Sequence, residues 1–252
     1  MSSPTAARDW DAATYERVSD PQVAWATAVL DRLALRGDET VLDAGCGSGR
    51  VTKMLLERLP HGRVVAVDSA PSMVDGARKA LDPRATVKLS DLVDLALDEP
   101  VDAAFSNAVF HWIPDHDRLF ARLHAAMRSG ARLSAQCGGR GNVERFHNVV
   151  HEVAAESPYA EYLGGWGGPW NYAGADETAH RLERAGFTAV ETWLEPWPIT
   201  PPEPREYMRS VCLGHHLERL PADLSLGFVE EVARRAAPEL DYVRLNIVAT
   251  RG

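Results

Sequence analysis

The sequence predicts an α/β protein built on a doubly wound, mostly parallel sheet. In the first half of the chain, short runs of β-branched residues alternate with amphipathic runs of helical spacing, the order that places helices on both faces of a sheet. The run at 63–68 is apolar between its charged end residues, which is typical of a strand covered on both faces. We expect strands at 40–44, 63–68, 86–90, 101–106 and 130–136, and helices at about 20–35, 50–59, 69–81 and 115–128.

The second half of the chain breaks this alternation. A segment rich in glycine and aromatic residues lies at 159–172, and 196–204 holds five prolines. Here we expect helices at 142–156, 175–185, 206–220 and 226–236, and two more strands at 187–194 and 242–250. One domain over 1–252 is therefore expected, with a seven-stranded core over about 21–138 and 175–252, a lid over 10–20, and a helical cap over about 142–174, inserted after strand five, with helices in 205–237.

The composition disfavours several classes of partner. Lys and Arg number 27 against 36 Asp and Glu, a formal net charge of −9, and there is no dense basic run, so neither nucleic acid nor an anionic membrane is expected. No long apolar window or signal-peptide pattern occurs, so we expect a cytoplasmic protein. Three widely separated cysteines, Cys46, Cys137 and Cys212, predict neither disulfides nor a metal site. A monomer and a homodimer both remain open.

A glycine-rich turn at 41–50, Val-Leu-Asp-Ala-Gly-Cys-Gly-Ser-Gly-Arg, joins the first strand to an amphipathic helix. Its glycines are Gly45, Gly47 and Gly49. Glycine permits positive φ and close approach of a ligand to the backbone, and the helix start offers free N–H groups. A dinucleotide fingerprint would need its last glycine or alanine where Arg50 or Thr52 stands, so NAD and FAD are disfavoured.

Polar side chains end the next three expected strands. Asp68, Asp91 and Asn107 occupy these positions. Since the carboxyl ends of parallel strands meet at one edge of the sheet, we expect these residues near the glycine turn. Each carboxylate alone is equally well explained as a solvated strand end.

Together these motifs resemble class I S-adenosylmethionine-dependent methyltransferases. Leu42 to Gly49 is similar to the family's first motif, and 105–108 lies where the family carries its fourth. The resemblance implies a Rossmann-like methyltransferase sheet, S-adenosylmethionine as cofactor and S-adenosylhomocysteine as product. It also implies that Asp68 accepts from the ribose hydroxyls and Asp91 from the adenine amino group. The implied cofactor-binding residues are Asp43, Gly45, Gly47, Gly49, Asp68, Ser69, Met73, Asp91, Leu92, Asn107 and Tyr15.

Segments 10–15, 106–112 and 206–221 resemble the trans-aconitate methyltransferase group and its biotin-pathway malonyl-carrier relatives, with a more distant similarity to juvenile-hormone-acid methyltransferase. Because these relatives esterify a carboxylate, the resemblance implies O-methylation of a small acid by in-line transfer. The wider family also methylates carbon, nitrogen and hydroxyl oxygen. A non-catalytic relative that keeps the cofactor site is a further alternative.

Candidates for the acceptor site follow the fourth strand and lie in the expected lid and cap. His111 is the candidate catalytic residue, which either orients the acceptor or acts as a general base; a hydrogen-bonded structural histidine is the alternative. The candidate substrate-binding residues are Trp10, Trp112, Trp166 and Trp170, and the candidate pocket arginines, for which surface ion pairs are favoured, are Arg140, Arg145, Arg205 and Arg209. A cap rich in tryptophan favours an acceptor with an apolar or ring-shaped body over trans-aconitate.

Overall fold

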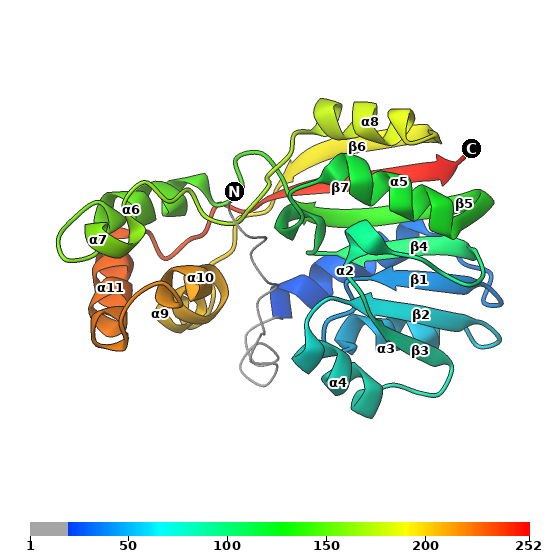
Figure 1. Cartoon of the computed structure of the whole chain (residues 1–252), viewed down its shortest axis with the longest axis horizontal. Helices are drawn as coiled ribbons and strands as arrows, with labels where there is room; N and C mark the ends of the chain where they lie inside the picture. The colour runs from blue at the N-terminus through cyan, green and yellow to red at the C-terminus, as the bar shows by residue number, and fades with distance from the viewer. Residues whose placement is uncertain (1–19) are drawn as a thin grey trace.

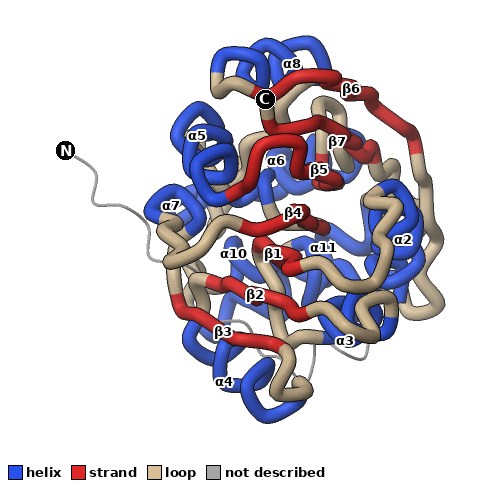
Figure 2. Tube along the Cα trace, turned by 90° about the vertical axis from the view of Figure 1, so that its right-hand side faces the viewer, coloured by secondary structure: helices blue, strands red, loops and turns tan. Residues whose placement is uncertain are grey.

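The computed structural model describes residues 20–252, and within them seven strands form one sheet (Figure 1). The strands follow the order β3-β2-β1-β4-β5-β7-β6, which Figure 2 shows from bottom to top. Their bounds are β1 Thr40–Ala44, β2 Arg63–Asp68, β3 Ala85–Leu89, β4 Val101–Asn107, β5 Met127–Gly138, β6 Phe187–Pro196 and β7 Val243–Arg251. Trp10 and Tyr15 lie outside the described residues.

The strand order creates a switch point beside β1. Strand β1 pairs in parallel with β2 on one side and with β4 on the other, so the chain moves outward through β2 and β3 and then returns past β1. Strand β7 is antiparallel to both β5 and β6. In open α/β sheets, ligands bind at the carboxyl ends of the strands beside such a switch point.

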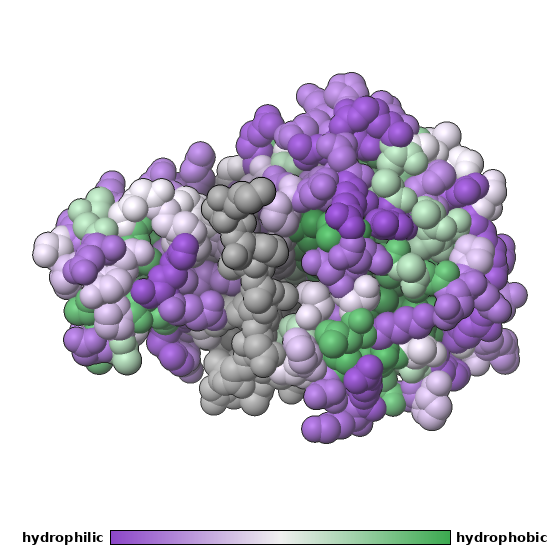
Figure 3. Space-filling view, viewed as in Figure 1, coloured by the Kyte–Doolittle hydropathy of each residue, from purple (hydrophilic) through white to green (hydrophobic). Residues whose placement is uncertain are grey.

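Helices cover both faces of the sheet, as a doubly wound fold requires. One buried cluster packs α2 (Asp20–Arg32), α3 (Arg50–Glu57) and α4 (Pro71–Ala80) against one face. A second packs α5 (His116–Ala126) and α8 (Ala175–Arg184) against the other. The outer surface over α5 and α8 is mostly hydrophilic (Figure 3), so each helix buries a single face.

A third hydrophobic cluster lies apart from the sheet, beyond the carboxyl ends of β1 and β4 (Figure 1). Its elements are α6 (Glu144–Ala154), α7 (Ala160–Leu163), α9 (Pro204–Tyr207), the π-helical turn Met208–Cys212, α10 (Gly214–Leu217) and α11 (Ala222–Arg235). Trp25 of α2 links this cluster to the sheet, with its ring centroid 5.2 Å from that of Tyr242 and 6.2 Å from that of Trp197. Within residues 20–252 no helix has the length and hydropathy to cross a bilayer.

The predicted fold class is confirmed, but the single helix expected at 206–220 is wrong. The structure divides this stretch into α9, the π-helical turn and α10. The Ser210 hydroxyl donates to the Glu206 carbonyl at 2.7 Å, a side-chain bond that competes with the regular helical ladder. The Leu213 N–H then donates to the Met208 carbonyl five residues back, and the helix restarts at Gly214.

Candidate cofactor and acceptor site

The glycine turn is held in shape by backbone bonds to β2. The N–H groups of Gly45 and Cys46 both donate to the Val67 carbonyl, at 2.8 and 3.0 Å. Gly45, Gly47 and Gly49 have φ of 91°, 54° and 89°, values that L side chains rarely adopt. Gly49 is also the N-cap of α3, so the turn delivers the chain directly to a helix N-terminus.

Two of these glycines face different surroundings. A Cβ on Gly45 would lie 2.2 Å from Val109 Cγ2, so the turn packs tightly against the loop after β4. A Cβ on Gly47 would have no heavy atom within 4 Å. Gly47 therefore presents its bare backbone to open space, which is the arrangement that close approach of a ligand needs.

Asp43 supplies a buried acceptor without a partner beneath this turn. Its side chain is 1% exposed. Oδ2 accepts a hydrogen bond from the Thr52 hydroxyl at 2.6 Å, while Oδ1 is buried without a hydrogen-bond partner. Burial raises the pKa of Asp43 to about 7, the Thr52 hydroxyl opposes the rise, and the charge of Asp68 adds to it. A buried carboxylate oxygen without a donor is costly, so a cationic or N–H group of a ligand fits this position.

Asp68 at the end of β2 fixes the other side of the turn. Its Oδ2 accepts from the Gly47 N–H and its Oδ1 from the Ala70 N–H, each at 2.9 Å. Burial raises the pKa of Asp68, and these backbone bonds oppose the rise. Each carboxylate oxygen has two lone pairs, so both can still accept from ligand hydroxyls. Met73, in the neighbouring α4, is buried. Ser69, which lies just before that helix, is exposed.

The ends of β3 and β4 complete this edge of the sheet. Asp91 is exposed and accepts from the Val93 N–H at 3.0 Å, which leaves its other oxygen facing solvent. Leu92, which follows it, is buried in the core. Asn107 ends β4 in register with Gln136 of β5. The structure thus places Asp43, Asp68, Asp91 and Asn107 at or just after the carboxyl ends of four neighbouring parallel strands, whereas Met73 and Leu92 are buried.

His111 is buried beside this edge and is hydrogen-bonded to the backbone. Its Nδ1 accepts from the Gly138 N–H at 3.2 Å, so the neutral ring carries its proton on Nε2. Burial and the positive charge of Arg244 hold the pKa of His111 well below its usual value. The imidazole is therefore neutral at pH 7, and Nε2 is a hydrogen-bond donor.

An aromatic cluster adjoins His111. The ring of Trp112 lies 4.8 Å from His111 and 6.1 Å from Trp170. Trp170 stacks on His147 at 4.5 Å and on Tyr172 at 6.0 Å, the latter with an interplanar angle of 6°. The predicted substrate residues Trp112 and Trp170 are thus brought together, from chain segments nearly 60 residues apart.

Trp166 lies at a different place. Its ring packs edge-on against His216 at 4.9 Å, and the guanidinium of Arg219 lies 4.3 Å over its other side. His216 is 1% exposed, and neither of its ring nitrogens has a hydrogen-bond partner. Burial lowers the pKa of His216 to about 3. Trp166 therefore packs on the helical cluster, and His216 lies between it and Trp170, with ring centroids 4.9 and 5.9 Å away.

The residue that sequence reasoning missed is Arg244. It is 2% exposed at the start of β7, lies in register with Gly138 of β5, and its charge lowers the pKa of His111. The sequence pattern that could have identified Arg244 is a charged residue that alternates with apolar residues in an otherwise buried strand. The four arginines considered from the sequence all lie in surface ion pairs instead: Arg140 with Glu177, Arg145 with Glu239, Arg205 with Glu230 and Arg209 with Glu206.

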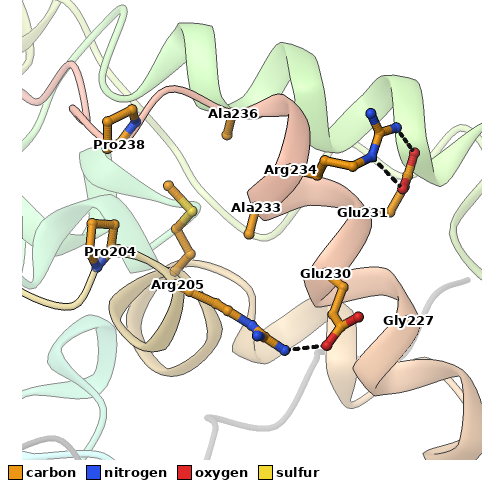
Figure 4. A pocket seen from close by; sticks show the side chains of 10 residues that line it. Pro204, Arg205, Gly227, Glu230, Glu231, Ala233, Arg234, Ala236 and Pro238 are labelled. Carbon is orange, nitrogen blue, oxygen red and sulfur yellow. Dashed lines mark hydrogen bonds and ion pairs between the residues drawn. The ribbon is translucent and has the colours of Figure 1, made fainter.

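A groove of ≈ 690 Å³ lies away from these residues, between α9 and α11 (Figure 4). Arg205 points across it to Glu230, and Arg234 pairs with Glu231 on its rim. Its lining includes the candidate Arg205 but none of the predicted cofactor-binding residues or tryptophans. Residues 20–252 also contain no group of three His, Cys, Asp or Glu side chains that could hold a metal ion.

Comparison with known proteins places this chain in a family. Residues 41–130 match the model of a methyltransferase domain family. A trans-aconitate 2-methyltransferase of Variovorax paradoxus (strain S110) is 32% identical over 240 residues, covering 90% of this chain and 88% of the relative. Another, of Methylobacterium nodulans (strain LMG 21967 / CNCM I-2342 / ORS 2060), is 33% identical over 74% of this chain and 67% of its own.

Solved structures share the fold at lower identity. Phosphoethanolamine N-methyltransferase 2 of Haemonchus contortus, in complex with S-adenosyl-L-methionine, superposes with a TM-score of 0.65 at 19% identity, over 98% of this chain and 58% of that one. The glycine turn, the strand-end carboxylates and the full-length relatives agree on one conclusion. The chain belongs to the class I S-adenosylmethionine-dependent methyltransferases, close to the trans-aconitate methyltransferase group.

Proposed function

We propose that this enzyme methylates a carboxylate oxygen of a small organic acid. The observation that carries the proposal is the state of His111, whose Nδ1 is occupied by the Gly138 N–H and whose pKa is held well below its usual value. A hydroxyl or ammonium acceptor must lose a proton to a base, and this histidine is a poor one. The relatives named as trans-aconitate 2-methyltransferases support the same chemistry.

The cofactor residues bind and orient S-adenosylmethionine. Asp68 accepts from the ribose hydroxyls, and Asp43 offers its unpartnered Oδ1 to the ammonium of the methionine portion. Gly47 lets that portion lie against the backbone. When bound, the cofactor supplies an electrophilic methyl group on a sulfonium.

A carboxylate is already a nucleophile at pH 7. One of its oxygens would form the new O–C bond with the methyl group that the cofactor supplies, the C–S bond would break with its electron pair left on sulfur, and no proton would need to move. The protein then has to place the carboxylate oxygen in line with the methyl group and to exclude water. The N–H on Nε2 of His111 donates to the carboxylate oxygen that is not methylated, which leaves a lone pair of the other oxygen free to attack.

The helices α6, α7 and α9–α11 form the cap in this proposal. Their segment brings Trp170 against Trp112, beside His111. Flat aromatic walls favour an acceptor with an apolar or ring-shaped body and exclude water from the transfer. The proposal therefore favours aromatic or branched monoacids over a highly charged tricarboxylate.

Transfer of a labelled methyl group to a matched panel tests this proposal. The acids are trans-aconitate, 3-phenylpropionate and indole-3-acetate; the comparison acceptors are 3-phenylpropanol, a phenol and a phenylalkylamine. We expect label in base-labile methyl esters, and no label with Asp68→Ala, which removes the carboxylate expected to hold the ribose. Label confined to the phenol, alcohol or amine would contradict carboxylate methylation. It would favour methylation of a hydroxyl oxygen or of nitrogen instead.

A further inference from the structure

Arg244 is a buried cation with a free donor. Its Nε donates to Gln136 Oε1 at 3.2 Å, and its guanidinium carbon lies 4.3 Å over the ring of Trp25. Nη2 is buried and has no hydrogen-bond partner among residues 20–252. Gln136 is itself held by Asn246, to whose Oδ1 it donates at 2.8 Å. The guanidinium is therefore held at Nε by Gln136 and on one face by Trp25, while Nη2 is available to a further partner.

No carboxylate in the described part of the chain neutralises Arg244. The groups whose charge would favour its cationic form are Cys137, Tyr172, Tyr242 and Tyr207. Burial raises the pKa of Cys137 to about 12 and raises the pKa of Tyr172 and of Tyr242, so these groups are neutral at pH 7.

The residue opposite Arg244 in β6 is an acid that is engaged elsewhere. Glu195 lies in register with Arg244, a position from which cross-strand ion pairs form. Its Oε2 instead accepts from Asn246 Nδ2 at 3.1 Å, and its charge acts on Arg32. The buried guanidinium thus lacks a counter-charge although an acid stands opposite.

This arrangement is costly for the ligand-free fold. Arginine stays protonated in proteins, and burying an unpaired ion costs several kcal/mol even after relaxation. The stacking on Trp25 and the bond to Gln136 offset only part of that cost. Other buried cations of proteins are paired, so a position of this kind is complete only when an anion occupies it.

Arg244 lies beside the backbone that holds His111, in the region of the proposed acceptor site. Arg244 is the register partner of Gly138, whose N–H holds His111 Nδ1. Its charge acts on both His111 and Tyr172. His111 and Arg244 are both placed beside Gly138, the last residue of β5. One is a neutral hydrogen-bond donor and the other is a cation.

We propose that Arg244 binds a carboxylate of the acceptor through Nη2 and makes the enzyme selective for organic anions. The identification of that anion as the methyl acceptor rests on the function proposed above; the anion site itself does not. Charge-assisted bonds from guanidinium to carboxylate are among the strong ones in proteins. Esterification removes the charge, so the methyl ester leaves Arg244 unpaired again and binds more weakly than the acid.

Binding of acids and their amides separates charge from shape. The enzyme loaded with S-adenosylhomocysteine is titrated by calorimetry with trans-aconitate, 3-phenylpropionate and indole-3-acetate, and with the amide of each. We expect at least one acid to bind about 30-fold or more tightly than its amide, as desolvated charge pairs do. Arg244→Met should abolish that preference and leave the amide affinity unchanged. The control Arg205→Met removes an exposed arginine and should change neither.

The outcomes distinguish the two proposals. An acid that binds through Arg244 but receives no methyl group refutes carboxylate methylation and leaves the anion site standing. Methyl transfer to an acid by Arg244→Met with wild-type KM refutes the anion site and leaves the function standing. Equal affinity of every acid and its amide in the wild-type enzyme also overturns the anion site.

Stability measurements exclude a merely structural role. Replacing an unpaired buried cation by a neutral side chain of similar length is neutral or stabilising, so Arg244→Met should keep the wild-type Tm or exceed it. If Arg244→Met does not fold, Arg244→Lys decides, because it keeps the charge but loses the forked donor. A tenfold or greater loss of acid affinity in Arg244→Lys, with unchanged amide affinity, supports the site; unchanged acid affinity overturns it.

Discussion

Gly45 and Gly47 stand two residues apart in one turn, yet alanine at each should impair a different property. At Gly45, φ is 91° and the new Cβ would lie 2.2 Å from Val109 Cγ2. The left-handed conformation costs an alanine about 1–2 kcal/mol, and the overlap costs about 1–3 kcal/mol more. Gly45→Ala should therefore destabilise the fold by about 2–5 kcal/mol.

Gly47→Ala should destabilise the fold less than Gly45→Ala does, and it should weaken cofactor binding. Its φ of 54° lies inside the left-handed region, and a Cβ there meets nothing within 4 Å, so only the conformational cost of about 1–2 kcal/mol applies. The added methyl group occupies the space from which the cofactor would contact the backbone. We expect the Kd for S-adenosylhomocysteine to rise by about tenfold or more, equivalent to about 1.4 kcal/mol.

Denaturant unfolding of the ligand-free variants and calorimetry with S-adenosylhomocysteine measure the two properties separately. Each kcal/mol should also move the Tm by about 2–4 °C for a domain of this size. Val109→Ala removes the atoms that the new Cβ would strike. In that background Gly45→Ala should cost about 1–3 kcal/mol less, a coupling that a double-mutant cycle reports. Zero coupling, or wild-type affinity in Gly47→Ala, would refute the reasoning.

Three further predictions concern the charged and hydrogen-bonding groups. Asp68→Ala should weaken S-adenosylhomocysteine binding about 100-fold or more by calorimetry, since each hydrogen bond to a charged group contributes about 1.5–3 kcal/mol; a change within threefold contradicts this. Because the pKa of Asp43 is raised to about 7, the folded state binds a proton there that the unfolded state has lost. The stability of the ligand-free protein should therefore fall as pH rises from about 4 to 7. Over the same interval S-adenosylhomocysteine should bind more tightly, and Asp43→Asn should flatten both profiles in thermal-shift titrations. His111→Phe should lower kcat/KM about 10–100-fold without changing cofactor affinity, because it removes a hydrogen bond to a charged group that contributes about 1.5–3 kcal/mol; the wild-type kcat/KM should show no ionisation of a histidine near pH 6.5.

The glycine turn of the cofactor site was predictable because its residues are contiguous in the sequence. The order strand, glycine turn, helix in 41–50 specifies its own geometry, since positive φ at alternate residues admits little but glycine. Asp68 and Asp91 then follow from one rule, that parallel strands end at a common edge. What the pattern could not show is that Asp68 also holds Gly47 and Ala70 in place, because those bonds depend on the exact path of the turn.

The residues of the proposed acceptor site were only partly predictable, because tertiary packing brings them together. Trp112 and Trp170 were found as aromatic residues near the right elements, but nothing local shows that Trp166 packs on His216 instead. Arg244 was passed over because a charged residue at the start of a strand is usually solvated. Its burial follows from Trp25 of α2, which lies more than 200 residues away in sequence.

The cofactor site and the proposed acceptor site differ in how replacements should act on them. Cofactor binding depends on one turn whose bonds run within β1, β2 and α3, so a single replacement there affects every acceptor equally. In our proposal, acceptor binding depends on Arg244 and His111, which are hydrogen-bonded to Gln136 and Gly138 of β5. Replacements more than 7–10 Å apart without common partners combine additively within about 0.3–0.5 kcal/mol. Gly47→Ala and Arg244→Met should therefore show additive effects on the binding of S-adenosylhomocysteine and an acid. Strong coupling would mean that the glycine turn and the region of His111 and Arg244 form one site.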